Sequence, residues 1–129
     1  MQRINISGGS RFEETYGYSR AVRAGETVYV AGTLGYDYAA GTCDPDPAAQ
    51  VRQIVRNIEP ALQKAGARLA DIVQLTTYIE SAEVFEAIGP TLREIFGDIR
   101  PANTALVVAF PIPLAKVEIS AIAVVGCGE

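Results

Sequence analysis

The chain has 129 residues, of which 49% are hydrophobic and 20% charged, and this predicts a single domain (residues 1–129) with a packed core. Its formal net charge is −4 and it contains no block of basic residues, which argues against nucleic acid as its main partner. It has no histidine, so a Ser-His-Asp triad and a histidine-ligated metal are excluded, and its two cysteines have no disulfide or metal-site spacing.

No stretch of the sequence approaches the roughly 20 apolar residues that a membrane-spanning helix requires. Residues Met1 to Asn5 also lack the apolar core of a signal peptide. We therefore expect a cytoplasmic protein with no membrane partner. Nothing in the pattern calls for a cofactor or a metal ion.

The N-terminal part of the chain is predicted to form three strands, at residues 3–7, 18–23 and 27–31. The last two are separated by a short glycine-containing turn, so they predict a hairpin. The polar stretch 11–17 is predicted to be a loop. Residues 32–47 are rich in glycine and proline, which predicts a long connection of the kind that often carries function.

Two helices and three strands are predicted to follow, as helices 48–65 and 82–96 and strands 71–80, 103–109 and 116–125. Asp46 is a suitable N-cap for the first helix, and Pro47 suits its first position. Pro60 lies inside this helix and predicts a kink or break near Arg56.

The resulting order, βββ-α-β-α-ββ, is typical of an α+β architecture in which two helices cover one face of a mixed sheet. The other face then needs a partner surface. The apolar residues predicted to lie on it are Val28, Val30, Val107, Ala109 and Ile122.

The last predicted strand contains two polar residues of the same parity, Glu118 and Ser120, within an apolar run. Burying a carboxylate in such a run costs free energy unless the group forms an ion pair, is hydrated or takes part in binding or catalysis. Glu118 is therefore a candidate for activating water, and the alternative is an ion pair with a nearby lysine or arginine, for instance Lys116. The preceding strand begins with two polar residues, Asn103 and Thr104, directly after Arg100-Pro101-Ala102.

Two further candidates lie near the start of the second predicted strand. Tyr18 can close a cleft and hydrogen-bond a ligand, although tyrosines at strand starts are often packing residues. Arg20 has the same parity as Tyr18 and so faces the same side, where its guanidinium can reach a carboxylate. Its alternative is a solvated or salt-bridged edge arginine. Gly32 can let backbone amides approach a ligand or simply form a turn.

In the order of its motifs the chain resembles the RidA family, also called YjgF or enamine/imine deaminase proteins. These motifs are Gly17-Tyr18, Val28 to Gly32, Asp71-Ile72-Val73, Arg100-Pro101-Ala102 and Val117 to Val124. The resemblance implies a chorismate-mutase-like fold and a homotrimer with three clefts between subunits. It also implies that Glu118 lies beside the ligand and is linked to the catalytic water, and that Tyr18 lines the cleft.

The sequence departs from the family pattern at several of these positions. Asn103 stands where the active imine deaminases carry an arginine that grips the substrate carboxylate, and an amide cannot replace a charged, planar fork. Thr33 stands in place of a frequent glutamine and Ser120 in place of a second glutamate. The substrate-binding set predicted for this chain is Tyr18, Arg20, Gly32, Thr33, Asn103, Thr104 and Ser120.

The resemblance implies hydrolytic deamination of a small enamine or imine metabolite, with Glu118 positioning the water. Because Asn103 lacks the charge of an arginine, short 2-imino acids are expected to be poor substrates, and a specialised compound such as an aminomuconate-like one fits better. The alternative is a trimer that binds a metabolite or stabilises proteins without catalysis. The family has also carried an endoribonuclease label, against which the acidic composition argues.

Overall fold

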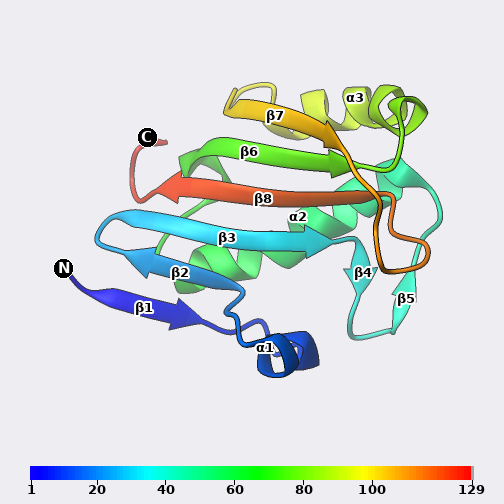
Figure 1. The fold of residues 1–129 in the computed structure, drawn as a ribbon. Helices are drawn as coiled ribbons and strands as arrows, with labels where there is room; N and C mark the ends of the chain where they lie inside the picture. The colour runs from blue at the N-terminus through cyan, green and yellow to red at the C-terminus, as the bar shows by residue number, and fades with distance from the viewer. Residues whose placement is uncertain (129) are drawn as a thin grey trace.

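The computed structural model describes residues 1–128 and shows a six-stranded sheet with helices on one side (Figure 1). The strand order is β1-β2-β3-β8-β6-β7, and β7 runs parallel to β6 while every other neighbouring pair is antiparallel. The strands of this sheet are β1 (Arg3–Ile6), β2 (Ala21–Ala24), β3 (Thr27–Leu34), β6 (Ile72–Ile79), β7 (Ala102–Val107) and β8 (Val117–Val124). The prediction of an α+β fold is confirmed.

The remaining elements connect these strands. The helices are α1 (Arg11–Tyr16), α2 (Pro47–Lys64) and α3 (Ala82–Phe96), with a 3-10 turn, η1 (Leu69–Asp71). A small hairpin, β4 (Tyr36–Asp37) and β5 (Thr42–Cys43), links β3 to α2. None of the helices within residues 1–128 is long and apolar enough to cross a membrane.

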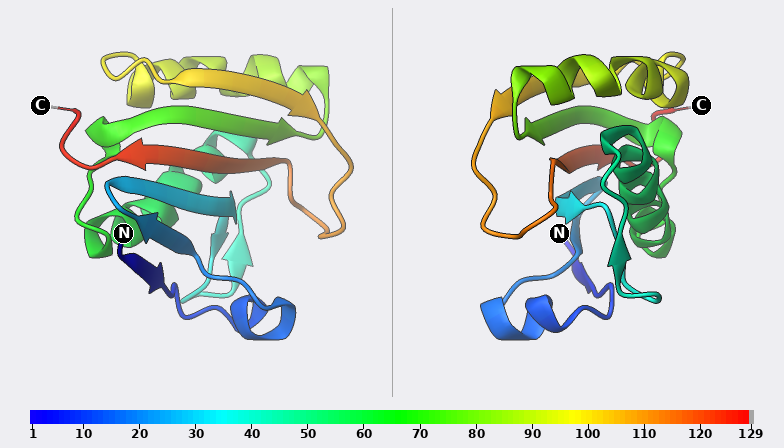
Figure 2. Two further views of the ribbon diagram at one scale, coloured as in Figure 1. Left: turned by 60° about the vertical axis from the view of Figure 1, so that its left-hand side comes forward. Right: turned by 90° about the vertical axis from the view of Figure 1, so that its right-hand side faces the viewer.

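The core lies between the sheet and helices α2 and α3, which share one face, as Figure 2 shows. The α2 helix starts as predicted, because the Asp46 side chain accepts a hydrogen bond from the Ala49 amide and Pro47 follows it. Its apolar stripe, which includes Val51, Ile54 and Leu62, is fully buried against the sheet.

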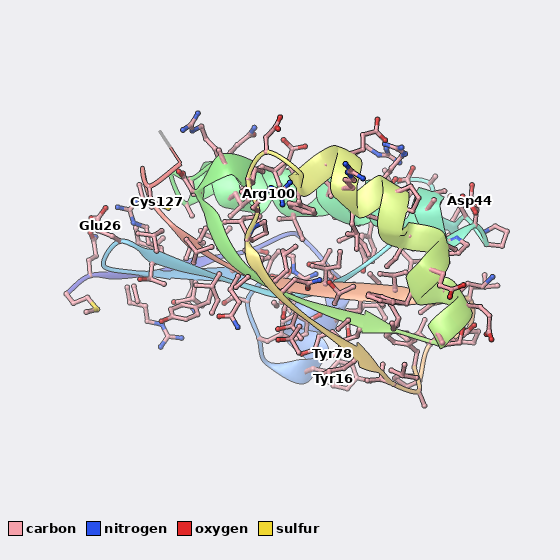
Figure 3. The ribbon with its side chains drawn as sticks, turned by 90° about the horizontal axis from the view of Figure 1, so that it is seen from above. Tyr16, Glu26, Asp44, Tyr78, Arg100 and Cys127 are labelled. Carbon is pink, nitrogen blue, oxygen red and sulfur yellow. The ribbon has the colours of Figure 1, made fainter. Side chains whose placement is uncertain are left out.

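The alternation predicted for the last strand is confirmed in β8. Val117, Ile119 and Ala121 are buried on the helix side, at 0%, 0% and 4% exposure. The residues between them, Glu118 and Ser120, are only partly buried and point to the opposite face. In Figure 3 Tyr78, the cross-strand partner of Glu118, lies on the side of the sheet away from α2 and α3. We call this side the open face.

Several local predictions were wrong. Residues 11–16 form a helix rather than a loop, because Ser10 and Glu13 make a reciprocal capping box and Gly17 ends the helix with a φ of 71°. The strand predicted from Tyr18 begins only at Ala21, and β3 extends through Gly32 to Leu34 with an irregularity after Val30. The break expected near Arg56 is absent, since α2 runs without interruption to Lys64.

The apolar residues predicted for the open face were also largely misplaced. Val28 and Val30 are buried on the helix side, because they pair with Ala123 and Ala121, which face the core. Val107 shares the register of Ile79 on the same side, and Ala109 lies beyond the end of β7. Of the five, Ile122 is the one on the open face, together with the half-exposed Tyr29 beside it on β3.

Candidate active site

A cavity of about 340 Å³ lies on the open face at the end of β8 where Glu118 is found. Its walls come from α1, the segment before β2, the end of β3, the segment after β4 and the loop after β7. The residues that line it are Phe12, Tyr16, Tyr18, Arg20, Gly32, Leu34, Tyr38, Pro111, Ile112 and Glu118. Four of the residues singled out from the sequence, Glu118, Tyr18, Arg20 and Gly32, are thus brought together.

Glu118 lies where β3 allows its carboxylate to approach the backbone closely. A Cβ atom added at Gly32 would be 3.0 Å from both Cδ and Oε2 of Glu118, so any larger residue there would crowd the Glu118 carboxylate. Burial raises the pKa of Glu118, and the positive charge of Arg20 partly offsets this shift. The ion pairs of residues 1–128 are Arg23–Glu26 and Arg52–Glu94, so the alternative of a pair between Glu118 and Lys116 is wrong.

Arg20 is a buried cation rather than an exposed edge arginine, and only 7% of its surface is accessible. Its Nη2 donates a hydrogen bond of 3.1 Å to the Gly32 carbonyl, and its guanidinium carbon lies 5.5 Å from the centre of the Tyr18 ring. Its Nε has no hydrogen-bond partner among residues 1–128. The alternative of a solvated or salt-bridged arginine is therefore wrong.

Aromatic side chains form much of the cavity wall. Phe12 and Tyr16 stack on one another along α1 with ring centres 6.2 Å apart, and Tyr16 remains 72% exposed. The hydroxyl of Tyr38 has a raised pKa because burial outweighs the opposing charge of Arg20. Sequence reasoning missed Phe12 and Tyr16, although the Ser10–Glu13 capping box signals the helix that carries them.

The other predicted residues lie outside this cavity. Thr33 is fully buried on the helix side, with its hydroxyl donating to the Ala31 carbonyl. Ser120 lies on the open face two residues after Glu118 on β8, in a row with Thr76 and Thr104. These polar side chains continue the open face from Glu118 towards the β7 edge.

Asn103 lies on the opposite face of the sheet from Glu118. It shares the register of Leu75, and its Oδ1 accepts a hydrogen bond of 2.9 Å from the Thr77 hydroxyl. It lines a separate hollow of about 350 Å³ between β7 and the end of α3, near Arg93 and Arg100. Within one chain, Asn103 and Glu118 therefore do not face the same cavity.

No group of three His, Cys, Asp or Glu side chains within residues 1–128 is placed to hold a metal ion. The candidate site thus consists of one carboxylate with a raised pKa, one buried guanidinium, tyrosine hydroxyls and an apolar rim. This donor set suits a small polar molecule that is held by hydrogen bonds and charge.

The fold and this cavity define a small α+β protein with a site for a small molecule, and comparison with known proteins identifies its family. Residues 8–125 match the family described as Endoribonuclease L-PSP. The 2-iminobutanoate/2-iminopropanoate deaminase of Capra hircus is 34% identical over 110 residues, which cover 84% of this chain and 80% of the goat protein. The chain therefore belongs to the Endoribonuclease L-PSP family, also known as the RidA or YjgF/UK114 family, and the resemblance seen in the sequence is confirmed.

Solved structures agree with this assignment. Rv2704 of Mycobacterium tuberculosis, a member of the YjgF/YER057c/UK114 family, superposes with a TM-score of 0.87 at 42% identity, covering 96% of this chain and 100% of Rv2704. E. coli TdcF with bound serine superposes with a TM-score of 0.77 at 26% identity, covering 83% of this chain and 87% of TdcF. The chorismate-mutase-like fold expected from the resemblance is confirmed.

Proposed function

We propose that this protein hydrolyses the C–N bond of a small imine or enamine metabolite in the cavity that contains Glu118. The observation that carries this proposal is a carboxylate with a raised pKa and no ion-pair partner, held in a concave site beside a buried cation. The deaminase names of relatives that are 30–34% identical support the reaction class.

In this mechanism Glu118 acts as a general base towards a water molecule. The water oxygen attacks the imine carbon, a C–O bond forms, and Glu118 accepts the proton that the water loses. The protonated carboxyl then delivers this proton to the nitrogen of the tetrahedral intermediate. Glu118 then transfers the proton of the newly formed hydroxyl group to the amino nitrogen, the C–N bond breaks as the C=O bond forms, and ammonia and a carbonyl compound are released. An enamine first takes a proton on carbon to become the imine.

The cavity also offers groups that hold the substrate. In this proposal the Tyr18 hydroxyl hydrogen-bonds the substrate, and Arg20 supplies the positive charge for an acidic group; both residues line the cavity. Arg20 does not offer a free Nε–Nη2 fork, however, because Nη2 already donates to Gly32. A serine is bound in the related TdcF, so a ligand of amino-acid size suits this fold.

We further propose a homotrimer in which neighbouring chains complete each cavity. Asn103 and Glu118 face opposite sides of one sheet, so they can share a cleft only when two copies contribute to it. The β7 edge fits this role, because all six of its residues are exposed in the single chain, including Leu106 at 47% and Val107 at 63%. Asn103, Thr104 and Ser120 would then be substrate contacts.

The second candidate function is a trimer that binds a metabolite or stabilises proteins without catalysis. This function is favoured by Asn103, an uncharged residue at the position where the family resemblance implies a substrate-binding arginine. Imino acids generated in situ distinguish the two functions. An enzyme will release ammonia faster than the uncatalysed reaction, and the Glu118→Gln variant will lose this acceleration. If neither short imino acids nor larger enamines are hydrolysed faster, while ligands still bind, the non-catalytic function is favoured.

A further inference from the structure

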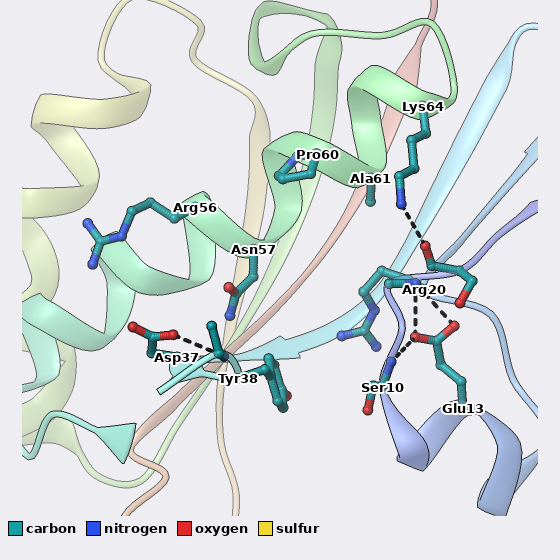
Figure 4. Close-up of a pocket in the computed structure, with 13 residues that line it drawn as sticks. Ser10, Glu13, Arg20, Asp37, Tyr38, Arg56, Asn57, Pro60, Ala61 and Lys64 are labelled. Carbon is teal, nitrogen blue, oxygen red and sulfur yellow. Dashed lines mark hydrogen bonds between the residues drawn. The ribbon is translucent and has the colours of Figure 1, made fainter. Parts of the chain in front are cut away.

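A second cavity, of about 250 Å³, is also lined by Arg20 but does not include Glu118. Figure 4 shows it between the second half of α2, the segment that leads into α1, and the residues after β4. It shares Arg20 and Tyr38 with the Glu118 cavity, and it is also lined by Arg56 and Lys64 of α2, which the Glu118 cavity lacks. We call it the α2 cavity.

The two carboxylates of the α2 cavity are already used by the backbone. Glu13 is 8% exposed, and its carboxylate accepts hydrogen bonds from the Gly8 and Ser10 amides at 3.0–3.3 Å. One oxygen of Asp37 accepts from the amides of Ala39 and Ala40 at 3.1 Å. These hydrogen bonds hold the loops in place, and neither carboxylate forms an ion pair within residues 1–128.

The three cations of the cavity donate their hydrogen bonds to uncharged oxygen atoms. Lys64 Nζ donates to the Ser7 carbonyl at 3.2 Å, and Arg56 donates to the side-chain oxygen of Gln53. Arg20 donates to the Gly32 carbonyl, and its Nε has no partner. None of the three belongs to an ion pair within residues 1–128. Three cations and two carboxylates thus line the cavity, so its lining is net positive in a chain with a net charge of −4.

The burial of Arg20 makes this imbalance energetically relevant. Arg20 forms no ion pair within residues 1–128, although it interacts with the charge of Glu118 in the neighbouring cavity. An anion in the α2 cavity would add to the compensation of this guanidinium, which burial removes from water. The uncharged polar side chains in the wall are Ser7, Ser10, Tyr38 and Asn57. Asn57 is fully used, because its Nδ2 donates to the carbonyls of Leu34 and Tyr36 and its Oδ1 accepts from Gln53. The cations are therefore the strongest groups that this cavity offers to a ligand.

We infer that the α2 cavity is a binding site for a small anion bearing a carboxylate or phosphate group, held by Lys64, Arg56 and the charge of Arg20. The site goes beyond the proposed reaction, which needs neither Lys64 nor Arg56. Its volume accommodates an inorganic phosphate or a short carboxylic acid. Lys64 and Arg56 both line the cavity, Lys64 at the end near Ser10 and Glu13 and Arg56 at the end near Asp37 (Figure 4).

Isothermal titration of the full-length protein with inorganic phosphate, and separately with succinate, tests this inference. We expect saturable binding to the wild type, weakened about tenfold in Lys64→Gln and in Arg56→Gln, because each change removes one charge-assisted hydrogen bond. Arg52→Gln is the matched control. Arg52 is an exposed arginine on the same helix, but it pairs with Glu94 outside the cavity, so its loss should leave binding unchanged.

Stronger binding of phosphate than of succinate would identify a phosphate-bearing ligand, and the reverse order a carboxylic acid. The Glu118→Gln variant should still bind both probes, because Glu118 does not line the α2 cavity, so this test does not depend on the proposed reaction. The inference is overturned if neither probe saturates at millimolar concentration. It is also overturned if Arg52→Gln weakens binding as much as the two cavity variants, provided that all variants keep the wild-type melting temperature.

Discussion

Glu118→Gln separates a catalytic carboxylate from a structural one, and the structure sets the expected size of both effects. Glutamine has nearly the same shape and still hydrogen-bonds, but it does not accept a proton from water. We therefore expect turnover of an imine substrate to fall by about 100-fold or more, which corresponds to about 2.7 kcal/mol in the activation barrier.

The same substitution should not destabilise the protein. A buried ion pair that loses one partner costs about 3–5 kcal/mol, but Glu118 has no such partner within residues 1–128. Because the pKa of Glu118 is raised in the folded state, its ionised form opposes folding, and this cost appears as the pH rises through the folded-state pKa. We expect Glu118→Gln to have an unfolding free energy equal to or above that of the wild type at pH 8, and the difference to vanish in acid, where the carboxyl is neutral.

The assay measures urea unfolding and ammonia release on one preparation of each protein, across a range of pH. In the wild type, kcat/KM should fall as the pH drops through a value above the ordinary glutamic acid pKa of 4.5, because the base must be ionised. Unchanged turnover in Glu118→Gln would refute the catalytic role. A loss of several kcal/mol in stability at pH 8 would refute the account of Glu118 as an unpaired carboxylate.

Three further predictions concern assembly, substrate charge and stability. Light scattering should give about three times the chain mass of 13.7 kDa, and a stable monomer at micromolar concentration would remove the shared-cleft proposal. Wild-type turnover of 2-iminopropanoate should be about 10- to 1,000-fold below that of a family member with arginine at the position of Asn103. The Arg20→Gln variant should turn it over more slowly still. If the wild type were as fast as the arginine-bearing family member, Arg20 would hold the carboxylate unaided. Asp71 is 1% exposed, and although burial raises its pKa, hydrogen bonds from the Gly128 and Arg68 amides together hold that pKa below its usual value. Asp71→Asn should therefore cost about 1–3 kcal/mol in urea unfolding at pH 7, a deficit that shrinks as the pH falls through the lowered pKa of the wild-type carboxyl; a constant deficit would contradict this.

Local patterns in the sequence were sufficient for most secondary structure. Asp46 and Pro47 predicted the start of α2, and the spacing of apolar residues predicted its buried stripe. Strict alternation placed Glu118 on the face opposite Val117 and Ile119. These predictions held because caps and side-chain periodicity depend only on neighbours in the chain.

Contacts between segments that are distant in the sequence could not be predicted from local patterns. The Ser10–Glu13 capping box was a local signal that was missed, but nothing local shows that α1 brings Phe12 and Tyr16 to the cavity. The assignment of Val28 to the open face was wrong because a strand's parity does not say which of its faces the helices cover. Only the sheet register decides that.

The sequence by itself therefore determined the family, the fold class and the presence of an unusual carboxylate on the last strand. The tertiary structure alone decided that Arg20, about a hundred residues away in the chain from Glu118, is buried beside it, because β3 lies between β2 and β8 in the sheet and carries Gly32 between the two side chains. It also decided that Asn103 faces away from Glu118, since the parallel register of β7 with β6 turns Asn103 towards the helix side. Charge and burial at a site depend on which strands become neighbours, and that choice is made by packing of the whole chain.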